Sequence, residues 1–64
     1  MQYKALLIDE IKELSTVATK EFTTEKKIAF MKEVLQVTSF DNLRKMKSEK
    51  LSEIIALIND AYIK

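Results

Sequence analysis

The sequence contains no cysteine, histidine, glycine, proline or tryptophan. Without cysteine the chain cannot form disulfides or use a thiolate nucleophile, and without histidine it lacks the commonest general base and a frequent zinc ligand. Without glycine it cannot build the phosphate-binding loops of nucleotide-binding proteins or the usual turns of β-hairpins. We therefore expect no enzymatic activity, no small-molecule substrate, no metal and no cofactor.

Long apolar runs and an excess of one charge are also missing. No apolar run approaches the roughly 18 residues that span a bilayer, and the first residues do not resemble a signal peptide. These features predict a cytoplasmic protein that does not enter the membrane. With 11 basic and 10 acidic residues the net charge is +1, which is too balanced for a general nucleic-acid binder.

Hydrophobic residues, by contrast, make up 47% of the 64 residues, and this fraction argues against a disordered chain. A chain of this length forms one small domain, predicted here to cover residues 1–64. Such a domain buries only about 60% of the surface of its unfolded chain, so its core is marginal. Because disulfides are excluded, close helix packing and association with another chain are the remaining sources of stability.

Apolar residues recur at helical spacing in three segments, at about 2–19, 24–36 and 48–62. Each segment has one broad apolar face, as expected for helices that pack against neighbours. The predicted fold is therefore all-α, a small helical bundle of three main helices. The residues predicted to form its core are Leu7, Ile11, Leu14, Ile28, Met31, Leu35, Leu51, Ile54, Ile55 and Ile58.

A short extra helix is predicted at about 39–46, where Phe40, Leu43 and Met46 share one helical face. Hydroxyl side chains stand where helices are expected to begin, because they can accept a hydrogen bond from a free backbone N–H. The predicted caps are Thr23 or Thr24, Ser39 and Ser48.

The first helix departs from a simple apolar face at two positions. Ile8 falls outside the apolar arc, and Glu10 falls within it, in line with Tyr3 and Val17. Glu10 either reaches to water at the edge of the face or pairs with a base from another helix or chain. Apolar faces this wide exceed what a small bundle can cover, which favours a homodimer or another bound protein.

Positive charge gathers in residues 39–50, which we call the basic corner, within the stretch SFDNLRKMKSEKL. We identify five candidate partner-binding residues there: Phe40, Arg44, Lys45, Met46 and Lys47. In one interpretation the bases steer an acidic partner segment while Phe40 and Met46 bury its apolar residues. In the other, Phe40, Leu43 and Met46 point inward as a plug, and the bases are only solvated.

Residues 37–58, VTSFDNLRKMKSEKLSEIIALI, resemble the closing segment of the C-terminal helical modules of phage single-strand annealing recombinases of the RecT, Redβ and ERF types. The residues that carry this resemblance are Ser39, Phe40, Leu43, Ser48, Glu49, Leu51, Ile54, Ile55 and Ile58. The chain differs by the added step from Arg44 to Lys47. The resemblance implies a module that docks partner proteins in DNA recombination, and not one that anneals DNA itself.

We therefore predict a non-enzymatic protein–protein interaction module of phage or mobile-element origin, which binds a partner protein, itself, or both through apolar helix faces. The alternative is a small nucleic-acid-binding regulator that uses the basic corner. Residues 39–47 offer one arginine and one asparagine for base edges. A nucleic-acid interface normally has more positive charge and more stacking aromatics, so nucleic acid is the less favoured partner.

Overall fold

The computed structural model describes residues 3–63, and every regular element in this range is helical. The elements are α1 (Tyr3–Ala18), α2 (Thr24–Phe30), the π-helical turn η1 (Met31–Leu35), the 3-10 helix η2 (Phe40–Lys45) and α3 (Ser48–Tyr62). The all-α prediction is confirmed. The predicted second helix ends in a π-helical turn, and the predicted extra helix is a 3-10 helix.

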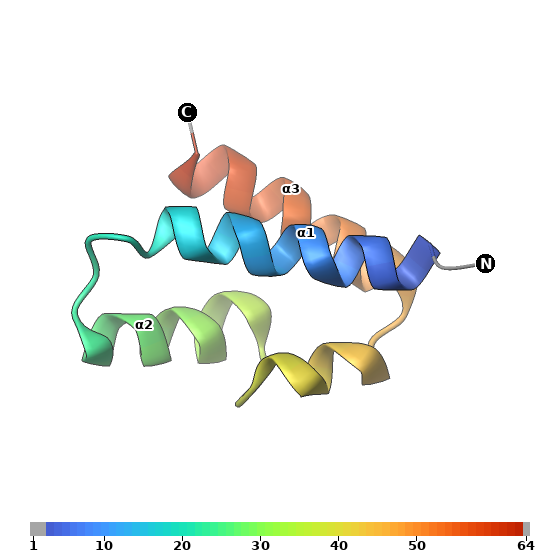
Figure 1. The fold of residues 1–64 in the computed structure, drawn as a ribbon, viewed down its shortest axis with the longest axis horizontal. Helices are drawn as coiled ribbons and strands as arrows, with labels where there is room; N and C mark the ends of the chain where they lie inside the picture. The colour runs from blue at the N-terminus through green and yellow to red at the C-terminus, as the bar shows by residue number, and fades with distance from the viewer. Residues whose placement is uncertain (1–2, 64) are drawn as a thin grey trace.

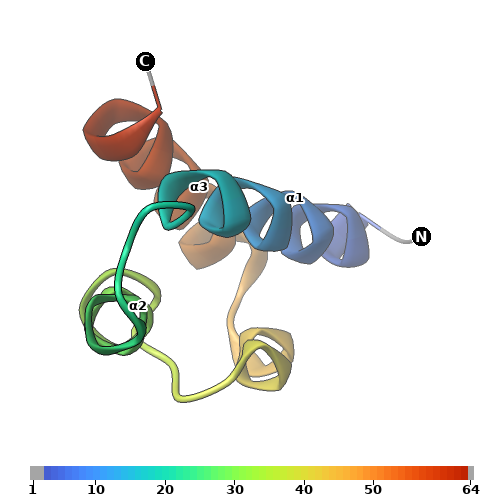
Figure 2. The same cartoon turned by 60° about the vertical axis from the view of Figure 1, so that its left-hand side comes forward.

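The two long helices, α1 and α3, lie side by side and run in the same direction, and α1 packs mainly on α3 (Figure 1). A return leg made of α2, η1 and η2 connects them and forms a second layer (Figure 2). The molecule measures 36 × 25 × 14 Å. Because the return leg is broken into short elements, it bends beneath the α1–α3 layer instead of forming a third long rod.

The core takes residues from every element as well as Val37 of the loop between η1 and η2: Ile8, Ile11, Phe30, Leu35, Val37, Leu43, Leu51, Ile54 and Ile58. Five of the ten predicted core residues are buried, and four of the others are partly buried against the core. The prediction is wrong for Ile28, which is 51% exposed, because Phe30 fills the core in its place.

The buried face of α1 is rotated from the predicted one. Ile8, Ile11 and Ser15 are buried, whereas Leu6 and Val17 are more than half exposed. The prediction for Ile8 is therefore wrong, because the return leg covers a side of α1 that apolar periodicity alone did not show. Glu10 is exposed.

Three aromatic rings lie at the end of the bundle where α3 stops. Phe30 of α2 and Tyr62 of α3 meet edge to face with ring centroids 5.2 Å apart. Phe22, from the loop after α1, approaches both rings at centroid distances of 6.1 and 6.2 Å. Edge-to-face contacts of this kind add to the area that the rings bury, so the cluster joins α2, α3 and the first loop.

Two of the predicted helix caps can be compared directly with the structure. Thr23 precedes α2, and its hydroxyl accepts a hydrogen bond from the Lys26 backbone nitrogen at 3.3 Å. The prediction for Thr23 is confirmed. Ser48 is the first residue of α3 and follows the capping position, which Lys47 occupies without a side-chain hydrogen bond. The prediction for Ser48 as a cap is wrong.

Candidate partner-binding groove

The chain forms no α-helix in residues 36–47, which we call the turn segment. The segment begins at Gln36, whose backbone is left-handed with φ 60° and ψ 35°. This conformation costs a residue with a Cβ roughly 1–2 kcal/mol, and glycine is its usual occupant at a helix end. The Gln36 and Val37 backbone N–H groups both donate to the carbonyl of Met31, which closes the π-helical turn.

Asn42 holds the turn segment in shape. Its Oδ1 accepts three hydrogen bonds, from Thr38 N at 3.2 Å, Thr38 Oγ1 at 2.8 Å and Ser39 N at 3.1 Å. Ser39 precedes η2 as predicted, and Asn42 is the third residue of that helix, where a polar side chain can reach back to the cap. These bonds replace the local conformational preferences that glycine or proline would supply.

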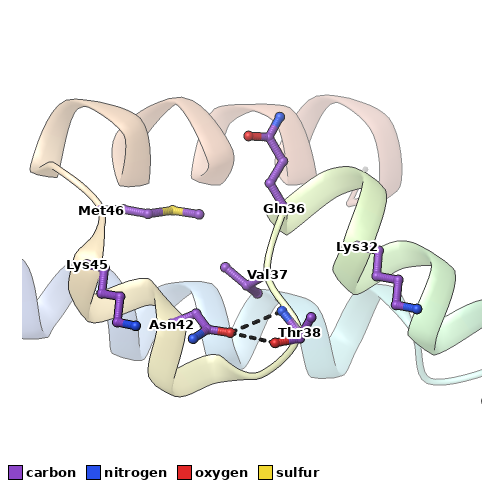
Figure 3. Close-up of a pocket in the computed structure, with 7 residues that line it drawn as sticks. All are labelled: Lys32, Gln36, Val37, Thr38, Asn42, Lys45 and Met46. Carbon is purple, nitrogen blue, oxygen red and sulfur yellow. Dashed lines mark hydrogen bonds between the residues drawn. The ribbon is translucent and has the colours of Figure 1, made fainter.

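A groove of about 470 Å³ lies between η1 and η2, on the side of the turn segment that Figure 3 shows. Its apolar surface comes from Val37, which is 6% exposed, and from the partly buried Met46. Its polar lining residues are Lys32, Gln36, Thr38, Asn42 and Lys45. The volume falls within the range of ligand pockets, and the side chains of Val37 and Met46 both reach its centre (Figure 3).

The charge of the groove has one sign. Lys32 and Lys45 are its two charged residues, and none of the described residues that line it is acidic. Both lysines belong to exposed positions of short helical elements, one on η1 and one on η2. The groove therefore combines an apolar floor with a positive field, and it is suited to a ligand that is both apolar and anionic.

The structure places the five candidate partner-binding residues in different surroundings. Lys45 and Met46 line the groove. Phe40 lines a smaller cavity of about 140 Å³, together with residues of α1, α2 and η1. Arg44 and Lys47 are exposed and do not line the groove, and the Arg44 carbonyl accepts a hydrogen bond from Lys4 Nζ.

The structure places the three residues of the plug interpretation differently. Leu43 is fully buried, as a plug would be, while Phe40 and Met46 are partly buried against the core. The exposed edge of Met46 faces the groove, so it is available to a ligand.

Five residues of the groove were not among the candidates: Lys32, Gln36, Val37, Thr38 and Asn42. Lys32 lies outside the basic corner, and only the fold of the return leg places it on the same groove as Lys45, at the opposite side (Figure 3). Asn42 carries a signal that could have identified its structural role, because Ser39 and Asn42 have the spacing of a capping box. Gln36 gives no such signal, since its sequence position does not reveal a left-handed backbone.

Two further properties of residues 3–63 concern metal ions and membranes. No cluster of three acidic side chains there is arranged to hold a metal ion. Within the same residues, no helix combines the length and the apolar character needed to cross a bilayer.

Comparison with protein families, with characterised proteins and with solved structures gives no significant match to this chain. The resemblance of residues 37–58 to recombinase modules therefore stays a prediction. The groove and its charges are the observations from which a function is argued.

Proposed function

We propose that this chain is a non-enzymatic protein-interaction module that binds an acidic segment of a partner protein in the groove between η1 and η2. The observation that carries the proposal is the joint presence of an apolar floor, Val37 and Met46, and two lysines without an acidic lining residue. An apolar side chain of the partner packs on the floor. Carboxylates beside it in the partner sequence meet Lys32 and Lys45.

Rough magnitudes indicate a weak, transient complex. Burying one leucine-sized side chain contributes about 1.5–3 kcal/mol, and each exposed ion pair adds at most about 1 kcal/mol. The sum is at most about 5 kcal/mol, and association also costs translational and rotational freedom, so the dissociation constant should be no tighter than about 200 μM. Methionine suits such a site, because its flexible side chain adapts to apolar groups of different shape.

Nucleic acid is less well supported by the same groove. Its lining contains no aromatic side chain on which a base could stack. Among the described residues, Phe22, Phe30 and Tyr62 are engaged with one another, Phe40 lines the smaller cavity, and Tyr3, which is 54% exposed, lies on α1 outside the groove. A nucleic-acid ligand would depend on phosphate contacts alone, and its binding would weaken steeply with salt.

The proposal is tested by the double substitution Lys32→Glu with Lys45→Glu. The probes are a short blocked peptide with a central leucine between glutamate runs, the same peptide with glutamines in place of glutamates, and oligothymidylate. We expect the acidic peptide to bind the wild-type protein and to lose at least about tenfold in affinity with the double variant, measured by NMR titration.

The matched control is Lys12→Glu with Lys20→Glu, which makes the same change of net charge at exposed positions outside the groove. This variant should bind the acidic peptide almost as the wild type does. Equal binding of the glutamate and glutamine peptides, or of none of the probes at about 5 mM, overturns the proposal. Tighter binding of oligothymidylate than of the peptide would favour the nucleic-acid alternative.

A further inference from the structure

Beyond the lysines, we infer that Asn42 determines the specificity of the groove for a carboxylate, by donating a hydrogen bond from Nδ2 to an acidic side chain of the bound segment. The inference rests on the proposed function, because it names how the acidic partner is recognised. Asn42 is a neutral residue, so the positive charge that identified the basic corner gives no reason to select it as a binding residue.

The orientation of the Asn42 amide follows from its partners. The backbone N–H groups of Thr38 and Ser39 can only donate, so the atom that faces them at 3.2 and 3.1 Å must be the carbonyl oxygen of the side chain. The amide nitrogen then points away from these two donors. No described residue accepts a hydrogen bond from Nδ2, and Asn42 lines the groove (Figure 3).

Asn42 therefore adds a hydrogen-bond donor of fixed orientation to a groove whose charged groups, the lysine ammonium groups, lie on flexible side chains. A lysine ammonium is a point charge on a flexible stem and sets little geometry by itself. The Asn42 amide is held by three hydrogen bonds, so its donor loses little freedom when a ligand arrives. A carboxylate that accepts from Nδ2 lies on the side of the groove lined by Lys45, which balances its charge, while Lys32 lines the groove beyond Thr38 (Figure 3).

The same bonds couple recognition to the shape of the loop. When a carboxylate accepts from Nδ2, it polarises the amide and strengthens the hydrogen bonds that Oδ1 accepts. The bound segment would thus stabilise the turn segment through Asn42. A contact with Lys32 or Lys45 alone has no comparable effect, because neither of these two side chains makes a described hydrogen bond to the turn segment.

Asn42→Asp separates the two roles of the side chain. The aspartate keeps the size of the side chain and an oxygen for Thr38 and Ser39, and it caps as well as asparagine does. It replaces the Nδ2 donor by a negatively charged acceptor. We expect the thermal unfolding midpoint to stay close to that of the wild type, while the affinity for the acidic peptide falls by about tenfold or more.

The matched control is Asn59→Asp on the exposed side of α3, which changes the same atoms and the same net charge outside the groove. Its affinity for the peptide should change less than about twofold, as for a screened surface charge. An Asn42→Asp protein that binds the acidic peptide as well as Asn59→Asp does would overturn the inference.

A second readout distinguishes a lost donor from simple charge repulsion. In the wild-type protein the Asn42 side-chain amide protons should shift downfield as the acidic peptide is added, while those of Asn59 stay in place. Unmoved Asn42 amide protons would overturn the inference even if the aspartate variant binds poorly. Larger shifts with oligothymidylate than with the peptide would identify phosphate as the ligand and overturn it as well.

The outcomes also separate this inference from the proposed function. If the Lys32→Glu with Lys45→Glu protein loses the peptide and the Asn42→Asp protein keeps it, the groove binds acidic segments without the Asn42 donor. If the wild-type protein binds no acidic peptide, the proposed function fails, and the inference fails with it.

Discussion

The α1–α3 pair and the turn segment are held by different kinds of interaction. In the pair, side chains such as Ile11, Leu51 and Ile58 are completely buried, and the helices are long and regular. In the turn segment the backbone passes through a left-handed residue and a 3-10 helix, and Asn42 fixes it by directional hydrogen bonds. Apolar packing therefore stabilises the α1–α3 pair, and hydrogen bonds determine the conformation of the turn segment.

The two regions are nevertheless joined. Leu43 is completely buried and Val37 is 6% exposed, so the turn segment places two apolar side chains in the common core. Lys4 of α1 also donates to the Arg44 carbonyl. The exposed lysines of the turn segment, Lys45 and Lys47, can change with little loss of stability, whereas its buried residues Val37 and Leu43 cannot. The predictions below test this division.

The largest effect is expected where the core is altered within the α1–α3 pair. Ile54→Ala removes a side chain that is 2% exposed, and it should lower the free energy of unfolding by about 2–5 kcal/mol. A domain of this size has little more stability than that, so much of the protein should be unfolded at 37 °C by circular dichroism. Leu57→Ala, at a 48% exposed position of the same helix, should cost about 1 kcal/mol or less. Similar unfolding midpoints for both variants would show that α3 does not pack as described.

A smaller effect of opposite sign is expected at the start of the turn segment. Gln36→Gly relieves the left-handed strain but adds freedom to the unfolded chain, so we expect a net gain of up to about 1 kcal/mol. Chemical denaturation measures this gain. Gln36→Ala, which keeps a Cβ, is the control and should not be stabilised. A loss of stability in the glycine variant would mean that the Gln36 side chain itself supports the fold.

The smallest effect on stability is expected on the outer face of α1, where Leu6 and Val17 are 65% and 60% exposed. Leu6→Asp should change the free energy of unfolding by less than about 0.5 kcal/mol.

The homodimer predicted from the sequence stays a prediction, and the outer face of α1 is where the structure allows it to be tested. We expect sedimentation at about 100 μM protein to show self-association of the wild type that Leu6→Asp weakens. A wild-type monomer at that concentration would remove the homodimer.

The sequence predicts most of the fold because apolar periodicity decides helix position and, in large part, helix face. It predicts α3 best, since Leu51, Ile54 and Ile58 share a narrow face that packs directly on α1. It misplaces the face of α1 by part of a turn, because the apolar residues of that helix surround more than one side. In the structure Ile8 is buried and Leu6 is 65% exposed, the reverse of what the apolar periodicity of α1 predicts.

The candidate groove is less predictable than the fold. Lys45 and Met46 could be identified because charge and apolar character coincide there in a short stretch. Lys32 enters the groove through the path of the return leg, which depends on the π-helical turn and on the backbone of Gln36. The residue pattern predicts neither the π-helical turn nor the left-handed backbone of Gln36, because both depend on how η1 and η2 pack against α1 and α3.

The order of the packed helices along the chain matters during synthesis. α1 leaves the ribosome first, and α3, the helix on which it mainly packs, leaves last. At about 5–20 residues per second, the segment between them takes about 1.5–6 s to make. During this time the apolar residues of α1 have no native cover. The exposed charged side chains Asp9, Glu10, Lys12 and Glu13 interrupt the apolar sequence of α1, so we expect them to protect the growing chain from aggregation.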